Sequence, residues 1–155
     1  MKILKPKQII IALDFDSAEE MNSIVKLLDP ELYRLKIGKQ LYASEGPKII
    51  EKLNKQGFDI FLDLKLHDIP NTVFKALKNL LNQKLWMTNI HLLGGEEMIQ
   101  AAREARDQAK SEALIIGVTV LTSLNEENIK NMGFNIQIPE LVKVLSKSAK
   151  QNNID

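Results

Sequence analysis

The chain alternates short apolar runs with longer segments in which apolar residues recur at helical spacing. Residues 8–15, QIIIALDF, form a continuous apolar run that ends in an acid, a pattern typical of a strand covered on both faces in a parallel sheet. Ser17 then begins the capping-box sequence Ser-Ala-Glu-Glu, and apolar residues at helical spacing follow: Met21, Ile24, Val25, Leu27 and Leu28. This first stretch predicts a strand followed by a helix.

The same alternation recurs four more times. Strands are predicted at 33–38, 59–66, 86–92 and 114–121, and helices at 46–57, 72–81, 96–110, from Asn125, and from Pro139 to about Lys150. Five polar residues mark the carboxyl ends of the strands: Asp14, Lys36, Asp63, His91 and Thr119. The steps between these markers are 22, 27, 28 and 28 residues, which indicates a succession of βα units and a parallel sheet.

Five βα units fit either a doubly wound sheet or part of a barrel, and the polar residues distinguish the two. The first strand is followed by Asp14-Phe15-Asp16-Ser17 and by no glycine-rich dinucleotide fingerprint. Polar residues at the ends of all five strands favour a barrel, whose site lies at that face, and a complete barrel takes ~250 residues. We therefore expect an incomplete parallel (β/α)₈ TIM barrel of about five βα units. Residues 1–155 would be a single domain, the N-terminal two-thirds of that barrel.

Composition and charge narrow the possible partners. The chain has 21 basic and 20 acidic residues, a net charge of +1, so no overall field attracts it to nucleic acid or to an anionic membrane. It has no cysteine, which excludes disulfides, thiolate catalysis and cysteine-bound zinc. Residues 1–7 are basic, but the apolar run from Ile9 to Leu13 is too short for a signal sequence or a membrane span. We expect a cytoplasmic protein.

The most unusual stretch is 61–72, FLDLKLHDIPNT, because charges interrupt an apolar strand. Strand alternation predicts that Leu62, Leu64 and Leu66 line one face and that Asp63, Lys65 and His67 line the other. Asp68 then lies at the end of the strand, and Pro70 suits the first turn of a helix. Lys36 and Asp14 end neighbouring strands, so we expect all these charges to form one cluster.

Such a cluster has three possible roles. Adjacent carboxylates favour the ammonium form of a lysine and hold it ready to donate a proton or to stabilise a carbanion. A purely structural ion-pair network is the plain alternative, although burying each ion costs roughly several kcal/mol, which makes stability alone a poor motive. A metal site is a third reading, but the interleaved lysines repel a divalent cation.

Other polar residues give weaker signals. His67 and His91 are the only histidines, and each alone is more often packed or hydrogen-bonded than catalytic. Thr122 and Ser123 follow the fifth strand and could bind a polar ligand, while Ser123 could equally cap the next helix. The pair Gly94-Gly95 is too short to identify a phosphate loop.

Four motifs together resemble the orotidine 5′-phosphate decarboxylase family: residues 12–14 (ALD), 35–38 (LKIG), 63–72 (DLKLHDIPNT) and 118–123 (VTVLTS). The resemblance runs in order through essentially the whole chain, and the ten-residue block is highly specific. It implies a cofactor-free (β/α)₈ barrel, a carboxy-lyase that converts orotidine 5′-monophosphate to uridine 5′-monophosphate in pyrimidine biosynthesis. No metal is implied.

The resemblance also implies residue roles. Lys36, Asp63 and Lys65 would come from one subunit of a homodimer, and Asp68 would complete the catalytic tetrad from the partner. Lys65 would protonate C6 of the pyrimidine as carbon dioxide leaves. The implied substrate contacts are Asp14 and Lys36 to the ribose, Thr72 into the partner's site, and Thr122 and Ser123 to the base.

Two departures from the family pattern affect these expectations. Residues 91–95 read His-Leu-Leu-Gly-Gly, where the family usually has a His-Ala-Ser-Gly-Gly type of turn. The family's phosphate-binding residues, an arginine and a glutamine in late loops and a Gly-Arg pair after the last strand, belong to the C-terminal third that these 155 residues lack, so we expect a truncated enzyme with little or no activity alone.

Two alternatives stay open. A related sugar-phosphate decarboxylase shares the Asp-x-Lys-x-x-Asp spacing, although residues 69–72 and 121–123 favour the orotidine family. The other alternative is a non-catalytic barrel remnant with an exposed sheet edge.

Overall fold

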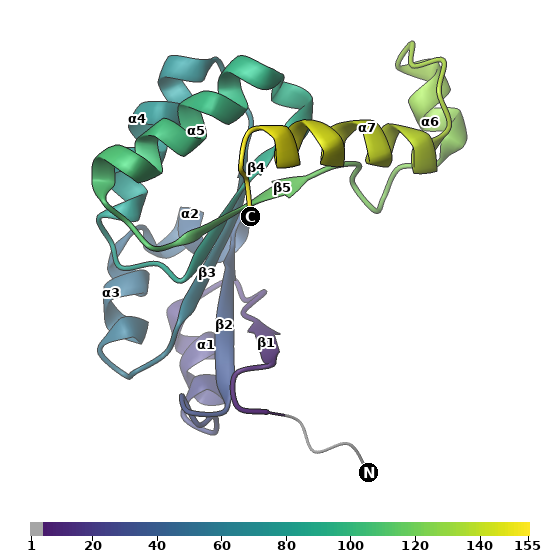
Figure 1. The fold of residues 1–155 in the computed structure, drawn as a ribbon. Coiled ribbons are helices and arrows are strands. Elements are labelled where there is room, and N and C mark those ends of the chain that lie inside the picture. The colour runs from purple at the N-terminus through teal and green to yellow at the C-terminus, as the bar shows by residue number, and fades with distance from the viewer. Residues whose placement is uncertain (1–4) are drawn as a thin grey trace.

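The computed structural model describes residues 5–155 as a five-stranded parallel sheet with helices between the strands (Figure 1). Residues 1–4 of the basic N-terminal segment lie outside the described residues. The strands are β1 (Ile9–Ala12), β2 (Tyr33–Gly38), β3 (Ile60–Leu66), β4 (Met87–His91) and β5 (Leu114–Val118). The helices are α1 (Ala18–Val25), α2 (Lys39–Glu45), α3 (Lys48–Asn54), α4 (Pro70–Leu81), η1 (Leu92–Gly94), α5 (Glu96–Ala109), α6 (Glu126–Asn131) and α7 (Ile138–Gln151).

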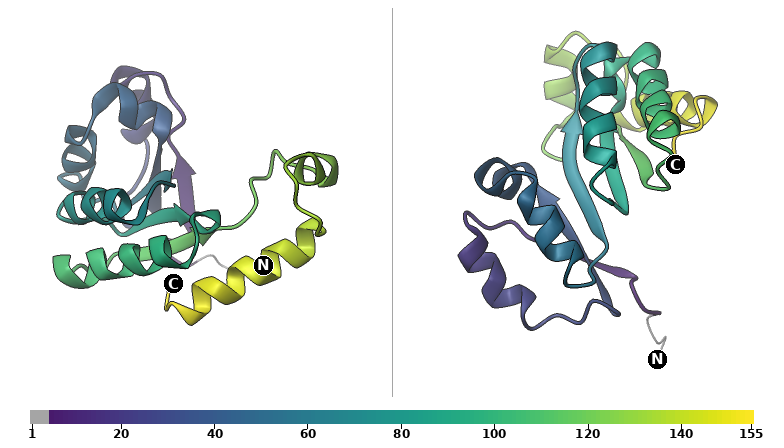
Figure 2. Two further views of the ribbon diagram at one scale, coloured as in Figure 1. Left: turned by 90° about the horizontal axis from the view of Figure 1, so that it is seen from above. Right: turned by 90° about the vertical axis from the view of Figure 1, so that its left-hand side faces the viewer.

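The five predicted βα units are confirmed, and the strands lie side by side in chain order, β1-β2-β3-β4-β5. All four neighbouring pairs are parallel. Helices α1 to α5 lie along one side of the sheet, whereas α6 and α7 form an arm that extends away from it (Figures 1 and 2). This is the arrangement of part of a (β/α)₈ barrel, in which the helices form the outer layer and the strands the inner one.

The helix termini follow local chemistry. The Ser17 hydroxyl caps α1 by accepting from the Glu20 backbone N–H at 3.3 Å, and Pro70 occupies the first turn of α4. The predicted helix over 46–57 begins at Lys48 and ends at Asn54. The sequence pattern missed α2, which begins without a side-chain cap and is separated from α3 by Gly46 at φ +65°.

Two expectations about the first βα unit are wrong. The first strand is not covered on both faces, because Ile9 and Ile10 are 38% and 39% exposed. Within residues 5–155, β1 is an edge strand whose strand partner is β2. The apolar pattern also extends past the end of the helix. Helix α1 ends at Val25, and Leu27 is 81% exposed.

The core lies between the sheet and the helices on its outer side. Leu35, Ile37 and Leu62 contribute fully buried side chains from the central strands. The helices that flank β4 bury apolar residues at helical spacing, which are Val73, Leu77, Leu80 and Leu81 in α4 and Met98, Ile99, Ala102 and Ala105 in α5. The core therefore holds the strands in place from one side.

A cluster of polar residues joins the amino-terminal ends of the strands. The Asp59 carboxylate pairs with Lys7 Nζ at 3.1 Å and with Arg34 Nε at 3.3 Å. The Arg34 guanidinium lies 3.9 Å from the centre of the Trp86 ring, and it donates to the Lys7 carbonyl. This end of a barrel serves stability, while chemistry is placed at the opposite end.

The last residue lies against the free edge of β5. The Asp155 backbone N–H donates to the Ile115 carbonyl at 3.0 Å, and the Ile115 N–H donates to the Asp155 carboxylate at 2.9 Å. Arg106 of α5 pairs with the same carboxylate. These contacts bring the end of α7 back to the sheet. Across residues 5–155, no helix is long and apolar enough to span a membrane.

Core leucines and exposed leucines should respond very differently to truncation. We expect Leu77→Ala in α4, which is fully buried, to lower the free energy of unfolding by about 2 to 5 kcal/mol. Leu27→Ala is the matched control and should change it by less than about 0.5 kcal/mol. Urea unfolding followed by circular dichroism measures both variants, and equal losses would contradict this assignment of the core.

Candidate active site

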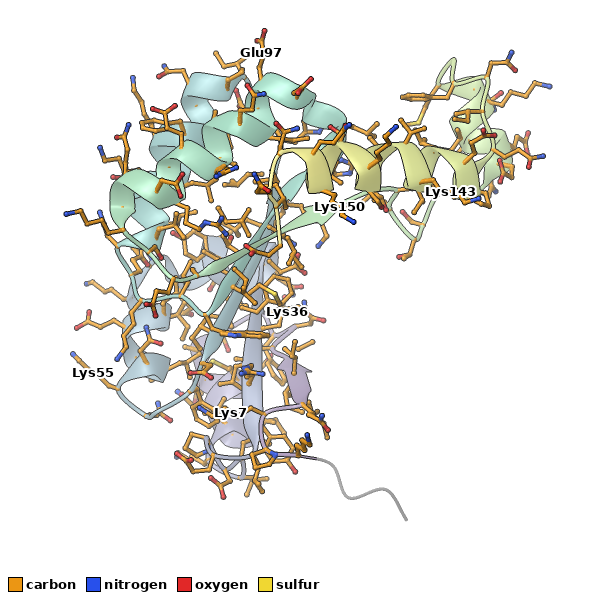
Figure 3. All side chains as sticks on the ribbon, in the orientation of Figure 1. Lys7, Lys36, Lys55, Glu97, Lys143 and Lys150 are labelled. Carbon is orange, nitrogen blue, oxygen red and sulfur yellow. The ribbon has the colours of Figure 1, made fainter. Side chains whose placement is uncertain are left out.

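Four of the predicted site residues meet at the carboxyl ends of β1, β2 and β3. Lys36 Nζ lies 3.2 Å from Asp14 Oδ1 and 3.4 Å from Asp63 Oδ2, and Lys65 Nζ lies 2.6 Å from Asp63 Oδ1. The charges therefore alternate in space in the order Asp14, Lys36, Asp63, Lys65. Figure 3 labels Lys36 beside β2, far from Lys55 at the end of α3 and away from the helical layer.

The carboxyl end of β3 departs from the expected strand alternation at Lys65. The strand pairs Phe61 with Met87 and Leu62 with Thr88, but Leu66 next pairs with Ile90. Three residues of β3 thus lie opposite one residue of β4, which is a β-bulge. Such bulges redirect side chains beside active sites.

Lys65 also has φ of +50°, in the left-handed region. A non-glycine residue there costs about 1 to 2 kcal/mol, and it persists only where surrounding contacts compel it. Leu64, Lys65 and Leu66 are all half-buried, so this part of β3 does not divide into one apolar and one polar face.

Asn89 of β4 is a site residue that the sequence reasoning missed. Its Nδ2 donates to Asp63 Oδ1 at 2.6 Å, and its Oδ1 accepts from the Lys65 backbone N–H at 2.7 Å. Asn89 is only 2% exposed. A polar residue in the middle of a buried strand is itself a signal, because such a group requires hydrogen-bond partners in the core.

Asp63 is the most buried charged group of the cluster, with a side chain 11% exposed. Burial opposes its ionisation, but hydrogen bonds from Lys65 and Asn89, together with the charges of Lys65 and Lys36, outweigh burial and hold the pKa of its carboxyl below the usual value. The carboxylate therefore stays negative at neutral pH.

The two histidines stack on one another beside the cluster. The rings of His67 and His91 lie 5.1 Å apart, centre to centre, with an angle of 15° between their planes. His91 is buried, and its Nδ1 has no hydrogen-bond partner within residues 5–155. Burial, and after it the positive charges of His67, Lys39 and Lys65, lower the pKa of His91.

Four other predicted residues are not brought into the cluster. Asp68, Thr72, Thr122 and Ser123 are all exposed. The Asp68 carboxylate accepts from the Ile69 N–H at 2.7 Å and forms no ion pair inside the described part of the chain. Ser123 does not cap the following helix, because Asn125 caps α6 through a reciprocal box with Asn128.

The turn after β4 places Leu92 in the core. Leu92 is 2% exposed, and its Cδ2 lies 2.6 Å from where a Cβ on Gly117 of β5 would be. A side chain at position 117 would therefore clash with it. The apolar residue at 92 and the glycine at 117 fit together.

Surface hollows mark two regions of very different chemistry. A hollow of about 420 Å³ lies at the end of β3, between Tyr42 of α2 and the residues Leu64, Lys65 and His67. A larger one of about 600 Å³ lies between α3 and the loop before β4, at the amino-terminal end of the strands. Barrel chemistry occurs at the carboxyl ends of the strands. The smaller hollow lies at that end, and Lys65 is the residue of the charged cluster that lines it.

Fixed opposite charges in this arrangement can stabilise a charge that develops during a reaction. The Lys65 ammonium is held by Asp63, and the side chain of Lys65 is 34% exposed. A preorganised ammonium requires little rearrangement when a neighbouring carbon gains negative charge. The cluster is therefore suited to proton donation to a carbanion.

Comparison with known proteins identifies similar chains. The family model described as "Orotidine 5'-phosphate decarboxylase / HUMPS family" matches residues 7–155. The orotidine 5′-phosphate decarboxylase of Saccharophagus degradans is 51% identical over 148 residues, and that of Carboxydothermus hydrogenoformans is 46% identical over 153 residues. The crystal structure of the Lactobacillus acidophilus enzyme of the same name is 36% identical, with a TM-score of 0.89.

The extent of these matches is unequal. The two curated relatives match 96% of this chain, but the chain spans only 62% and 64% of their lengths. The L. acidophilus structure covers 97% of this chain, and the match takes in 69% of that structure. The similarity therefore extends over nearly all of this chain and over about two thirds of the related proteins.

The stacked histidines predict a pH dependence. Because the pKa of His91 lies below the ordinary value of ~6.5, the unfolded chain binds more protons than the folded chain between the two values. The free energy of unfolding should therefore fall as pH is lowered below about 6.5. Asp63 acts in the same direction, but only below its ordinary pKa of ~3.9.

NMR titration of the imidazole carbons should show His91 titrating below pH 6.5. His67→Phe keeps a stacked ring but removes its charge, so it should raise the pKa of His91. Urea unfolding at pH 7.5 and 5.5 measures how the free energy of unfolding changes with pH. A His91 that titrates at or above pH 6.5 would contradict this description.

Proposed function

Because this chain belongs to the orotidine 5′-phosphate decarboxylase / HUMPS family, we propose that it carries the catalytic cluster of an enzyme that decarboxylates orotidine 5′-monophosphate. The observation that carries this proposal is the alternating set of charges Asp14, Lys36, Asp63 and Lys65 at the carboxyl ends of three adjacent strands. The product of the proposed enzyme would be uridine 5′-monophosphate, made in pyrimidine biosynthesis.

In the proposed reaction, Lys65 is the general acid. The bond between C6 and the carboxylate breaks, the electron pair stays on C6, and the Lys65 ammonium gives its proton to that carbon. Two unit charges about 4 Å apart interact by roughly 4 kcal/mol at an effective dielectric of 20. A fixed ammonium can thus contribute substantially to stabilising the carbanion. The electron pair remains on the substrate, so this step requires no redox partner.

Asp63 has two functions in this proposal. Its carboxylate holds the Lys65 ammonium at 2.6 Å, and it would lie beside the departing carboxylate of the substrate. Its lowered pKa supports a role as a permanent anion. Lys36, which pairs with both Asp14 and Asp63, links the catalytic carboxylate to the ribose-binding end of the site.

We further propose that Asp14 and Lys36 bind the ribose and that Thr122 and Ser123 bind the base. The side chain of Asp14 is 65% exposed although it pairs with Lys36, which leaves its second oxygen accessible to a hydroxyl. Thr122 and Ser123 are exposed in the loop between β5 and α6. All four residues lie at or after the carboxyl ends of their strands.

The proposed enzyme works as a homodimer with shared sites. Asp68 and Thr72 are exposed beside Ile69, which is 66% exposed. An exposed isoleucine next to polar residues is suited to contact with a second subunit. Asp68 would complete the tetrad in the partner's site, and Thr72 would reach the partner's substrate.

We propose that the 155 residues form one domain and that the phosphate contacts come from the region that the longer relatives have beyond the matched part. Binding the phosphate supplies energy that is used at the reacting carbon. The 155-residue chain alone should therefore turn over orotidine 5′-monophosphate slowly or not at all. The curated relatives at 46% and 51% identity carry the orotidine name, which favours this substrate over a sugar phosphate.

A chimera tests the proposal directly. The chimera is this chain extended with the remaining C-terminal part of the S. degradans relative. It should consume orotidine 5′-monophosphate, which is measured as the loss of the absorbance of that substrate. Lys65→Ala should lower kcat of the chimera by about 10³-fold or more, because it removes the proton donor and the stabilising charge. Lys55→Ala, on the exposed end of α3, is the matched lysine control and should have no effect.

Three outcomes would contradict parts of the proposal. Robust turnover by the 155-residue chain would show that the additional region is not required. Turnover that survives Lys65→Ala would remove the role assigned to that lysine. Turnover of a sugar phosphate in place of orotidine 5′-monophosphate would favour the sugar-phosphate alternative.

Mixing two inactive variants of the chimera tests the shared site. Lys65→Ala disables a subunit's own half of the site, and Asp68→Asn disables the half that it gives to its partner. A mixed dimer then contains one intact site, so equal mixing with subunit exchange should restore about one quarter of the original activity. The unmixed variants are the controls, and no recovery in mixtures that exchange subunits would contradict a shared site.

A further inference from the structure

Asn89 occupies an unusual place between the catalytic strand and its neighbour. The β3–β4 pairing passes from Leu62 opposite Thr88 directly to Leu66 opposite Ile90. Asn89 is therefore the one residue of β4 that lies opposite the three bulged residues 63–65. On its other side, β4 stays in regular register with β5, where Asn89 pairs with Ile116.

Within the bulge, the Asn89 side chain replaces the missing main-chain pairing. The Lys65 backbone N–H, which has no place in the regular ladder, donates to Asn89 Oδ1 at 2.7 Å. The same residue has φ of +50°. A backbone conformation of this kind needs surrounding contacts to hold it, and this hydrogen bond supplies one from a fully formed neighbouring strand.

The other end of the same amide holds the catalytic carboxylate. Asn89 Nδ2 donates to Asp63 Oδ1 at 2.6 Å, and that oxygen also accepts from Lys65 Nζ at 2.6 Å. The remaining oxygen, Oδ2, faces Lys36 at 3.4 Å. Every charged neighbour of Asp63 in these contacts is thus a cation, and Asn89 is its neutral donor.

Only an amide of this length satisfies both partners at once. The opposite orientation of the amide would place its oxygen against the carboxylate and its NH₂ group against the Lys65 N–H. An aspartate would keep an acceptor for Lys65 but would repel Asp63, and an apolar residue would leave both groups unpaired in the core. Since Asn89 is 2% exposed, water does not readily replace it.

We infer that Asn89 is a positioning residue, which fixes the Lys65 backbone and the Asp63 carboxylate together so that the ammonium of Lys65 points to one place. Asn89 contacts neither the Lys65 ammonium that would donate the proton nor the substrate carbon that would accept it. Its effect on turnover rests on the proposed function, whereas its effect on the geometry of Asp63 and Lys65 does not.

The first test is made on the 155-residue chain by NMR. Asn89→Ala should raise the pKa of Asp63, read from its side-chain ¹³C carboxyl shift, because the carboxylate loses a donor. It should also speed amide hydrogen exchange at Lys65. Asn89→Asp separates the two roles: exchange at Lys65 should stay slow at neutral pH, while the pKa of Asp63 rises because a second carboxylate faces it.

Thr88→Val is the matched control, because Thr88 is the adjacent fully buried polar residue and donates to the Leu62 carbonyl at 3.0 Å. This variant should lose stability without moving the pKa of Asp63. Equal pKa values for Asp63 in the original chain, Asn89→Asp and Thr88→Val would overturn the inference. The isosteric Asn89→Asp decides it if Asn89→Ala does not fold.

The second test uses the chimera. Asn89→Asp should lower kcat about 10-fold or more and change KM by less than about 3-fold, since the interaction acts on the reacting geometry. Unchanged kcat, in a chimera that Lys65→Ala inactivates, would overturn the inference. If the unsubstituted chimera is inactive, the proposed function fails, and the NMR test still decides the role of Asn89.

Discussion

The rest of the site depends on the interactions of the Asp63 carboxylate with its neighbouring donors and cations. One oxygen accepts from Lys65 and Asn89, and the other faces Lys36, which in turn pairs with Asp14. A buried carboxylate is stable only when such donors and cations compensate for its lost hydration. Each neighbour therefore has a defined position because Asp63 is charged, and Asp63 stays charged because the neighbours are there.

The fold supports this carboxylate by dividing its tasks between the two ends of the sheet. At the amino-terminal end, Asp59 joins Lys7 and Arg34, and Arg34 stacks on Trp86, so the first four strands begin from a connected base. The helices bury one side of the sheet along its length. At the carboxyl end the regular ladder is interrupted, and a bulge with left-handed backbone at Lys65 is tolerated because the remainder of the sheet is regular.

Some of the predicted site residues contact one another within a single chain, and others are exposed on its surface. Asp14, Lys36, Asp63 and Lys65 already contact one another, whereas Asp68 and Thr72 stand exposed beside Ile69. The free edge of β1 exposes Ile9 and Ile10. The relatives are longer than this chain. The proposed second subunit and the proposed additional region would pack against these exposed residues.

The order of strands and helices and the identity of the charged cluster could be predicted from the sequence, because periodicity, capping residues and polar strand ends are local signals. The family motif at 63–72 contains two residues of the observed cluster, Asp63 and Lys65, whereas Asp68 and Thr72 of the same motif lie outside it. Tertiary structure alone decided the bulge, the backbone of Lys65 and the role of Asn89, since each depends on how β3 pairs with a strand about 25 residues away. It also decided that β1 has an exposed edge and that Leu92 fills the space beside Gly117, because the burial of an apolar residue depends on neighbours that its own segment does not contain.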